Sequence, residues 1–347
     1  MRARAHQRES GRPTSWPRSV VSKCKTLVYR RPLDEFRRCA RWGVLPYFRC
    51  NAWARAMERA AERLRMTDPG PTGRVVEVWF LTGARFWYQT AFCAWTLARQ
   101  SERQLIVNLV DDGTLTPTHE AHLRRLFPEG KTVWKEAAGR RLDTLLPRER
   151  YPVLRQRWAD YVNIRKLTDI HLGSRGVKLV LDSDMLFFRR PDALLNWWDR
   201  AGRLTADRRP FPGEEAESEA EFAPCLMTDC VESYGYSRPL MEELAGAPIP
   251  PLLNVGICGL RSEDLDWDEL ETWCRTLVER EGTSYFLEQA LVAMLAARSG
   301  PVVMSKQDYI TFPTREQTQL ATGVLQHYVA DSKPWYFGDA WRLASRA

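Results

Sequence analysis

Two aspartates stand two positions apart, directly after a short apolar run. The run covers residues 177–181, and Asp182 and Asp184 follow it with Ser183 between them. Residues two apart on an extended chain project to the same side, so both carboxylates face one direction. Two carboxylates so close repel each other unless a positive charge lies between them. Because hard oxygen ligands suit Mn²⁺ or Mg²⁺, the pair predicts a site for a divalent cation.

A second motif lies near the C-terminal end. His327 is followed, after five intervening residues, by Lys333, Pro334 and Trp335. Taken alone, His327 would be read as a surface histidine and the Lys-Pro-Trp sequence as a turn.

The elements that must position these side chains alternate between strands and helices. Apolar periodicity predicts strands at 75–81, 105–110, 177–181 and 255–260, and helices at 86–99, 117–127, 154–172, 266–279 and 285–297. Nearly continuous apolar strands between helices indicate an α/β fold with a mostly parallel sheet flanked by helices. Ligands bind such sheets at the carboxyl ends of the strands, which is where Asp182 and Asp184 would lie.

Two enzyme classes place Asp-x-Asp after an apolar strand. In the haloacid-dehalogenase phosphatases the first aspartate, here Asp182, is a phosphoryl nucleophile. In the GT-A glycosyltransferases the pair holds a metal ion on a nucleotide-sugar diphosphate. The phosphatases open their core domain with this strand, whereas two predicted strand–helix units precede it here. The aspartate pair alone leaves both classes open.

The C-terminal motif favours the glycosyltransferases. The segment from His327 to Lys333, Pro and Trp closely resembles the closing motif of the glycogenin and lipopolysaccharide galactosyltransferase family, the family 8 glycosyltransferases. The resemblance implies one GT-A-type domain with a nucleotide-binding sheet. It also implies a Mn²⁺ or Mg²⁺ ion held by Asp182, Asp184 and His327, with Lys333 against the donor diphosphate. These implied roles suit the chemistry, because a neutral imidazole beside two carboxylates favours Mn²⁺ over Ca²⁺ and a lysine point charge offsets the charge of a phosphate.

Shorter motifs extend the same resemblance to the rest of the site. The residues that it implies for donor binding are Leu81, Thr82, Gly83, Lys166, Asp182, Ser183, Asn254, Gly256 and Lys333. An asparagine amide both donates to and accepts from vicinal hydroxyls, and a glycine lets the backbone approach a sugar ring. Glu288 and Gln289 match a pair that faces the transferred sugar, and they are the implied catalytic residues.

The chain departs from the family pattern at three places. Ala330 stands where the family has a glycine, Glu288 replaces an aspartate, and the turn after the first strand lacks the family's Asn or Asp. These differences bear on which base and sugar are bound. They also motivate a second alternative, a nucleotide-sugar-binding protein without activity.

The resemblance therefore implies a metal-dependent hexosyltransferase. Its donor would be a nucleotide-sugar, by analogy a UDP-sugar, and the anomeric configuration would be retained. An amide such as that of Gln289 is a weak nucleophile, which favours front-face attack by the acceptor over a covalent intermediate. No motif identifies the acceptor, so a glycan, a lipid-linked sugar and a protein all stay open.

Basic charge is concentrated at the N-terminal end. Residues 1–70 carry 17 Lys and Arg against 6 Asp and Glu, and the remaining 277 residues carry 34 against 38. A nucleic-acid-binding body needs positive charge on its docking face, so no nucleic-acid partner is expected. We expect residues 1–22 to be disordered, 23–70 to form a basic helical segment and 71–347 to form the GT-A-like domain. The aromatic residues interleaved among the arginines of this segment favour a helical hairpin packed on the main domain. Its basic charge leaves a second interpretation open, peripheral contact with an anionic membrane.

The sequence has no segment of the membrane-spanning or secretory kind, and this bears on the expected compartment. No run approaches the roughly 18–20 apolar residues of a membrane-spanning helix, and the arginine-rich start has no apolar segment of the secretory kind. The eight cysteines include no C-x-x-C pair, which predicts buried free thiols. We therefore expect a cytoplasmic protein, and peripheral association with the inner face of the membrane is a further hypothesis that rests on the basic segment.

Overall fold

The computed structural model describes residues 43–66, 74–203, 222–229, 234–251 and 253–346. The chain divides into two compact units, residues 1–52 and 53–347. The expected disorder of residues 1–22 lies outside the described residues, and the expected division at residues 70 and 71 stays a prediction. Within the described ranges, no helix is both long enough and apolar enough to cross a membrane.

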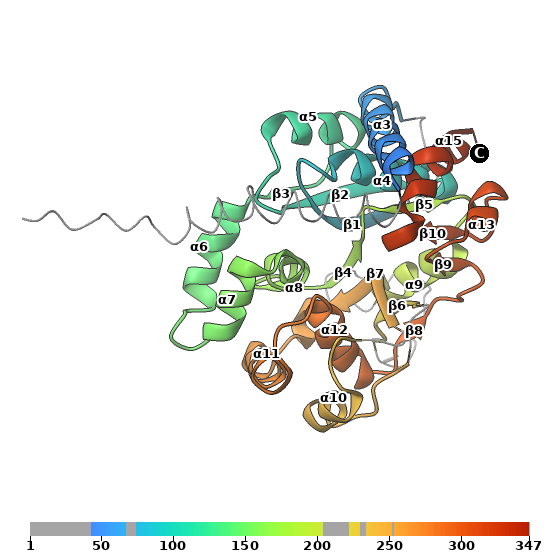
Figure 1. Ribbon diagram of the computed structural model, residues 1–347. Helices are drawn as coiled ribbons and strands as arrows, with labels where there is room; N and C mark the ends of the chain where they lie inside the picture. Colours follow the sequence, from blue (N-terminus) through green and yellow to red (C-terminus); the bar gives the residue numbers. More distant parts are fainter. Residues whose placement is uncertain (1–42, 67–73, 204–221, 230–233, 252, 347) are drawn as a thin grey trace, which may run out of the picture. The chain divides into compact units, whose positions relative to one another are not determined.

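Helices and strands alternate along the second unit, as Figure 1 shows. The α-helices are α3 (Val44–Ala61), α4 (Trp87–Ser101), α5 (Pro117–Leu126), α6 (Lys135–Leu145), α7 (Pro152–Asp160), α8 (Arg165–His171), α9 (Asp192–Arg203), α10 (Arg238–Ala245), α11 (Trp267–Glu281), α12 (Leu287–Ala297), α13 (Arg315–Gln319), α14 (Lys333–Trp335) and α15 (Trp341–Arg346). The strands are β1 (Val75–Thr82), β2 (Gln104–Asp111), β3 (Thr132–Val133), β4 (Val177–Leu181), β5 (Met185–Phe187), β6 (Cys225–Thr228), β7 (Leu253–Arg261), β8 (Val302–Val303), β9 (Tyr309–Thr311) and β10 (Leu325–His327).

Seven of these strands form one sheet, in the order β3-β2-β1-β4-β7-β6-β8. β7 runs antiparallel to both of its neighbours, and the other neighbouring pairs are parallel. The four predicted strands correspond to β1, β2, β4 and β7. The predicted α/β fold, with a mostly parallel sheet flanked by helices, is confirmed.

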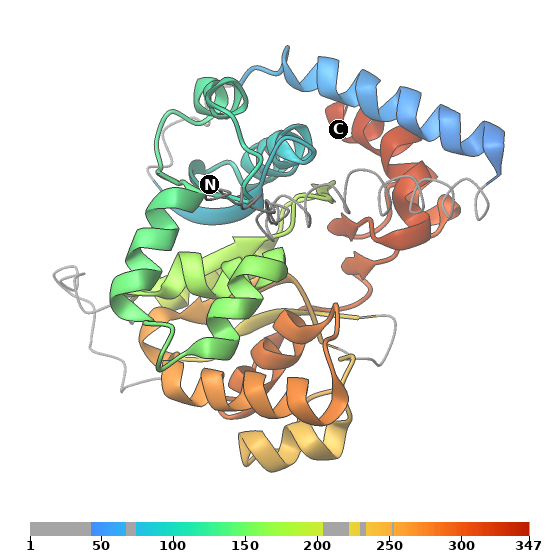
Figure 2. The ribbon, with the colours of Figure 1, turned by 60° about the vertical axis from the view of Figure 1, so that its left-hand side comes forward.

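The central strand β4 lies between two hydrophobic cores. Val177, Leu179 and Leu181 belong to the core that contains α4, whereas Val180 belongs to the core that contains α8, α11 and α12. Alternate residues of a strand face opposite sides of its sheet, so β4 is buried on both faces. In Figures 1 and 2, α4 lies on one side of the sheet and α11 and α12 on the other. A strand covered on both sides reads as a nearly continuous apolar run, which only Lys178 interrupts here, and this is why its bounds were predictable.

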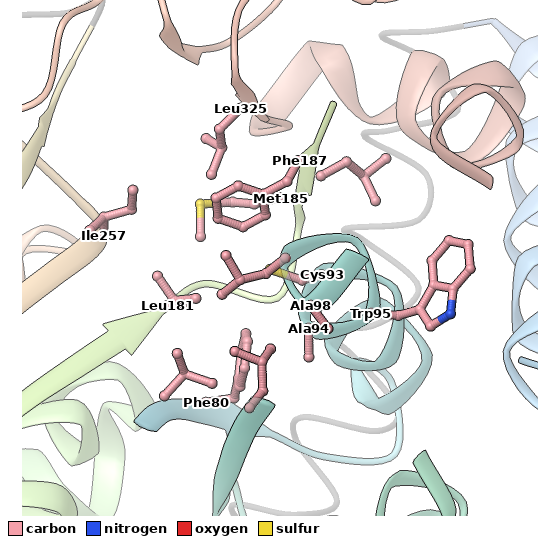
Figure 3. Close-up of a cluster of buried hydrophobic side chains, with 14 of the residues drawn as sticks. Phe80, Cys93, Ala94, Trp95, Ala98, Leu181, Met185, Phe187, Ile257 and Leu325 are labelled. Atoms are coloured by element: carbon pink, nitrogen blue, oxygen red, sulfur yellow. The ribbon is translucent and has the colours of Figure 1, made fainter. Parts of the chain in front are cut away.

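Three short strands form a second sheet that the sequence did not predict. Its order is β5-β10-β9, with β10 antiparallel to β5 and parallel to β9. Met185 and Phe187 of β5 and Leu325 of β10 point toward Leu181 and Ile257 of the large sheet (Figure 3). The two sheets therefore share one core.

The prediction of a single helix over residues 154–172 is wrong. α7 ends at Asp160, Tyr161 is extended with φ −131° and ψ 101°, and a 3₁₀ turn precedes α8. The Tyr161 hydroxyl donates a hydrogen bond to the backbone oxygen of Tyr285, at 2.5 Å. This contact with a segment far along the chain holds Tyr161 in the extended conformation that interrupts the helix.

The cysteines agree with the prediction of buried free thiols wherever they are described. Those that the structure describes as buried and unbridged are Cys50, Cys93, Cys225, Cys258 and Cys274. Burial raises the pKa of the Cys93 and Cys225 thiols, which keeps them protonated and unreactive.

Candidate active site and metal centre

One edge of the large sheet gathers polar residues from four strands. β1, β2 and β4 are parallel and end at this edge, with Asp182 directly after β4. β7 runs the opposite way and therefore begins there. The backbone N–H of Asp182 donates to the Gly256 oxygen at 2.8 Å, which extends the pairing of β4 with β7 to the first aspartate.

The small sheet brings His327 to the same place. β5 follows the aspartates directly, and its Met185 is the register partner of His327 on β10. The next residue, Tyr328, donates its N–H to the backbone oxygen of Asp184 at 2.9 Å. Backbone hydrogen bonds between β5 and β10 thus position an imidazole 143 residues away from Asp184 in sequence.

The predicted ligands lie close together. His327 Nε2 is 3.1 Å from Asp184 Oδ1 and 3.6 Å from Asp182 Oδ2. The imidazole is buried, with 2% of its side chain exposed, whereas the two carboxylates are 24% and 21% exposed. The site is therefore closed on the histidine side and reachable from solvent on the carboxylate side.

Lys333 lies on the second carboxylate. Its ammonium is 2.5 Å from Asp184 Oδ2 and 5.5 Å from the ring centre of Tyr336. Burial acts to raise the pKa of Asp184, but Lys333 and His327 outweigh it and hold the pKa well below its usual range. Asp184 is therefore ionised at neutral pH, as a metal ligand must be.

Lys166 lies on the first carboxylate. Its buried ammonium is 2.6 Å from Asp182 Oδ1 and 3.6 Å from Glu288 Oε1. Burial alone would lower the pKa of Lys166, but Asp182 and Glu288 raise it above its ordinary value. Burial raises the pKa of Glu288 to about 7, and Lys166 opposes this shift only in part. Polar and titratable groups thus run continuously from Lys333 through the three predicted ligands to Lys166 and Glu288.

Gly256 makes room for the histidine. A Cβ atom at this position would lie 2.6 Å from both Cε1 and Nδ1 of His327. The amide of Asn254 is engaged within the protein, because its Oδ1 accepts from the Gly256 N–H at 2.8 Å and its Nδ2 donates to Asp229 at 3.2 Å. Asn254 and Gly256 therefore shape the site, and their predicted contact with a donor sugar stays a prediction.

Hydroxyl groups connect the end of β1 to Ser183, the residue between the two aspartates. The Thr90 hydroxyl lies 2.8 Å from the hydroxyls of both Thr82 and Ser183. Gly83, at the end of β1, lies against Asp112, whose carboxylate a Cβ atom at that position would overlap at 2.0 Å. Thr82 and Ser183 are both buried, and Leu81 is half-buried. The donor contacts predicted for Leu81, Thr82, Gly83 and Ser183 stay predictions.

Gln289 follows Glu288 in the first turn of α12 and is buried. The N–H of Glu288 donates to the Tyr161 hydroxyl at 3.4 Å, which fixes the start of this helix beside the 3₁₀ turn before α8. Glu288 joins the charged groups of the site through Lys166, whereas the catalytic role predicted for both residues stays a prediction.

The donor atoms fit a divalent ion. Asp182, Asp184 and His327 each offer one ligand atom, and these atoms all lie within 4.8 Å of one another. Two carboxylate oxygens and one imidazole nitrogen form a donor set suited to Mn²⁺ or Mg²⁺. The exposed side of the carboxylates leaves room for further ligands from solvent or from a phosphate.

Sequence reasoning missed Asp229, Thr90 and Tyr161. Asp229 follows β6, a strand that was not predicted, although β6 ends at the same edge as β4. Thr90 lies in α4, where its spacing is that of an ordinary core position. The one available signal for Tyr161 was its place in the apolar pattern of 154–172, and that pattern indicated core packing.

A scan against protein-family models finds no match, and a search of the curated proteins finds none either. Among solved structures, the chain is similar to mouse xyloside xylosyltransferase 1 in its apo form, at 13% identity over 75% of this chain and 99% of that chain, with a TM-score of 0.45. It is also similar to the apo structure of the bifunctional glycosyltransferase WbbM, at 8% identity over 81% of this chain and 53% of that chain, with a TM-score of 0.47. A third similar structure is galactosyltransferase LgtC in complex with donor and acceptor sugar analogs, at 11% identity over 78% of this chain and 96% of that chain, with a TM-score of 0.45. The chain spans about half the length of WbbM. These likenesses are distant, and the geometry of the site carries the proposal that follows.

Proposed function

We propose that this chain is a metal-dependent hexosyltransferase that takes its sugar from a nucleotide-sugar, in the first place a UDP-sugar. One observation carries the proposal. The ligand atoms of Asp182, Asp184 and His327 lie within 4.8 Å of one another at the carboxyl edge of the large sheet, with Lys333 on the outer carboxylate. That arrangement matches what the sequence motifs imply for a nucleotide-sugar diphosphate.

Asp182, Asp184 and His327 would hold Mn²⁺ or Mg²⁺. When bound, the ion supplies a Lewis-acid charge toward the diphosphate of the donor. Lys333 is 23% exposed, so its ammonium also meets an anion that arrives from the solvent side. Its charge offsets the charge that develops on the departing nucleoside diphosphate, and no general acid is then needed for departure.

Lys166 has a positioning role in this proposal. Its ammonium is buried and lies between Asp182 and Glu288, so it fixes the orientation of the first carboxylate. Glu288 Oε1 is buried and has no hydrogen-bond partner within the described part of the chain. This oxygen is a candidate acceptor for a sugar hydroxyl, and Gln289 is its candidate partner on the sugar face.

We propose retention of the anomeric configuration by front-face attack of the acceptor. The support is the resemblance of Glu288 and Gln289 to the family pair, together with the weak nucleophilicity of an amide. Leu81, Thr82, Gly83, Ser183, Asn254 and Gly256 would contact the donor. Retention is read from the anomeric configuration of the product by NMR. A product of inverted configuration would contradict it.

A panel of nucleotide-sugars, incubated with the full chain in Mn²⁺ or in EDTA, tests the activity. We expect Mn²⁺-dependent release of the nucleoside diphosphate from at least one donor, abolished by Asp184→Ala and by His327→Ala. The exposed aspartate variant Asp308→Ala is the matched control and should keep the activity. Turnover and metal affinity that survive His327→Ala would end the proposal.

The same panel separates the two alternatives. A haloacid-dehalogenase-like phosphatase using Asp182 would release phosphate from phosphomonoesters, would be inhibited by fluoroberyllate and would be indifferent to His327. An inactive nucleotide-sugar-binding protein would bind UDP without turnover of any donor. We also propose a cytoplasmic location, which fractionation of expressing cells tests.

A further inference from the structure

A groove runs between the C-terminal part of α3 and the last helix, α15, away from the metal site. Its volume is about 370 Å³, and it is lined by Ala56, Arg59, Ala60, Arg63, Leu64 and Trp341. Both views place the C-terminal part of α3 beside α15 (Figures 1 and 2). The volume lies at the lower end of the range for ligand-sized sites, about 300–1,000 Å³.

Small side chains open this groove and apolar ones form its floor. Ala56 and Ala60 are four residues apart on α3 and so lie on one face of that helix. Leu64 and the Trp341 ring are half-buried, and the Trp341 indole N–H donates to the Phe337 oxygen at 2.9 Å. The tryptophan is therefore fixed in place with one side of its ring accessible from the groove.

Two positive charges border the apolar floor. Arg59 and Arg63 are exposed, and neither guanidinium pairs with a carboxylate of the described residues. Arg59 lies in the last turn of α3, and Arg63 lies in the turn that follows the helix. Both line the same groove, so an anion bound there would offset their mutual repulsion. Arg342 adds a third charge, with its guanidinium carbon 4.5 Å from the centre of the Trp341 ring.

We infer that this groove docks the chain on the surface of an anionic membrane. Lipid phosphates would lie on Arg59 and Arg63, and the apolar part of the lipid would pack on Leu64 and Trp341. Arginine beside tryptophan on an amphipathic face is the composition that lies in a membrane interface. The inference does not rest on the proposed glycosyl transfer.

Charge favours this occupant over a second copy of the chain. A symmetric contact between two copies would bring the arginines of both grooves together, and they would repel each other. The 42 residues that precede the described part carry 12 Lys and Arg against 3 Asp and Glu. The positive charge of the groove thus continues along the chain in the sequence just before α3, and each such residue near an anionic surface strengthens binding.

Co-sedimentation with vesicles tests the inference without any activity readout. The full chain should pellet with vesicles of phosphatidylcholine that contain one third phosphatidylglycerol, and should stay in solution with pure phosphatidylcholine. The double variant Arg59→Glu with Arg63→Glu should lower the partition coefficient at least about tenfold. The matched control, Arg140→Glu with Arg148→Glu, changes the same charge at exposed arginines near α6 and should bind as the unchanged chain does.

A third variant tests the apolar floor. Trp341→Ala should lower the partition coefficient at least about threefold at constant charge, with a thermal melt to verify folding. Equal binding of the two double variants, equal pelleting with both kinds of vesicle, or no pelleting of the unchanged chain would overturn the inference. So would capture of a short oligonucleotide, sensitive to Arg59 and Arg63, in the absence of vesicle binding.

Discussion

The large sheet and the small sheet contribute to the same site, but they are built differently. The large sheet supplies Asp182 through β4, whose five residues are all buried and, apart from Lys178, apolar. The small sheet supplies His327 through β10, a strand of three residues. A long strand is specified locally by its own residues. A three-residue strand exists only because partners far along the chain pair with it.

The same division runs through the charges of the site. On the large-sheet side, Lys166 lies between Asp182 and a glutamate whose pKa burial raises. On the small-sheet side, Lys333 and His327 hold the pKa of Asp184 low. Burial thus resists ionisation of Glu288 on the large-sheet side, whereas Lys333 and His327 favour ionisation of Asp184 on the small-sheet side. The proposed metal ligands come from both halves.

The largest expected effect tests whether the two sheets fold as one unit. Phe80 of β1 and Leu325 of β10 are both fully buried in the same core. We expect Phe80→Ala to lower the free energy of unfolding by about 3–5 kcal/mol and Leu325→Ala by about 2–5 kcal/mol. Each variant should keep a single cooperative transition in denaturant. A separate early transition in Leu325→Ala alone would show that the small sheet is an independent unit.

The next largest effect is a pH dependence of stability that differs between Glu288 and Asp184. Glu288 has an ordinary pKa of 4.5, which the folded protein raises to about 7. The folded state therefore binds this proton more tightly than the unfolded state, and the resulting stabilisation is complete below pH 4.5 and lost as pH rises through about 7. We expect Glu288→Gln, measured in EDTA, to remove a pH-dependent loss of up to about 3 kcal/mol over this window.

The exposed glutamate variant Glu62→Gln is the control and should keep the pH dependence. Asp184 has the opposite sign, because its stabilising effect is lost only as pH falls below its ordinary value of 3.8. An unchanged stability slope between pH 4.5 and 7 in Glu288→Gln would remove Glu288 from the account of the site.

A smaller effect is expected where the two sheets touch. Gly256→Ala places a Cβ atom 2.6 Å from the His327 ring, so the ring or the strand must move. We expect a loss of about 1–3 kcal/mol in stability and a weaker affinity for Mn²⁺. Gly202→Ala, in α9 with nothing within 4 Å of the added carbon, is the control and should be neutral or stabilising. Wild-type Mn²⁺ affinity in Gly256→Ala would contradict the contact.

The smallest effect concerns the turn between His327 and Lys333. Ala330 has a φ of +43°, in the left-handed region that favours glycine. Ala330→Gly should relieve about 1–2 kcal/mol of backbone strain in the folded protein. Part of this stabilisation is lost because glycine gives the unfolded chain more conformational freedom. We expect a net stabilisation of about 0.5–1 kcal/mol in denaturant titration. A destabilised variant would mean that the methyl group of Ala330 makes a contact worth more than the strain.

The large sheet was more predictable from the sequence than the small sheet. β4 was predicted with its observed bounds, because four of its five residues are apolar and three of these are consecutive. The meeting of Asp182 and Asp184 with His327 was inferred from the closing motif, and the structure does bring these side chains together. β5, β9 and β10 were not predicted, because three residues are too few for periodicity to be read. The break at Tyr161 was missed because its cause, a hydrogen bond to Tyr285, lies elsewhere in the chain.

Titration of the full chain with Mn²⁺ in the absence of nucleotide, followed by electron paramagnetic resonance, tests the claim that the three side chains share one ion. We expect one bound ion per chain, and an affinity that falls at least about tenfold in Asp184→Ala and in His327→Ala, while Asp308→Ala binds as before. Equal affinity of His327→Ala and the unchanged chain would contradict the claim, because the histidine would then lie beside the two carboxylates without sharing an ion with them.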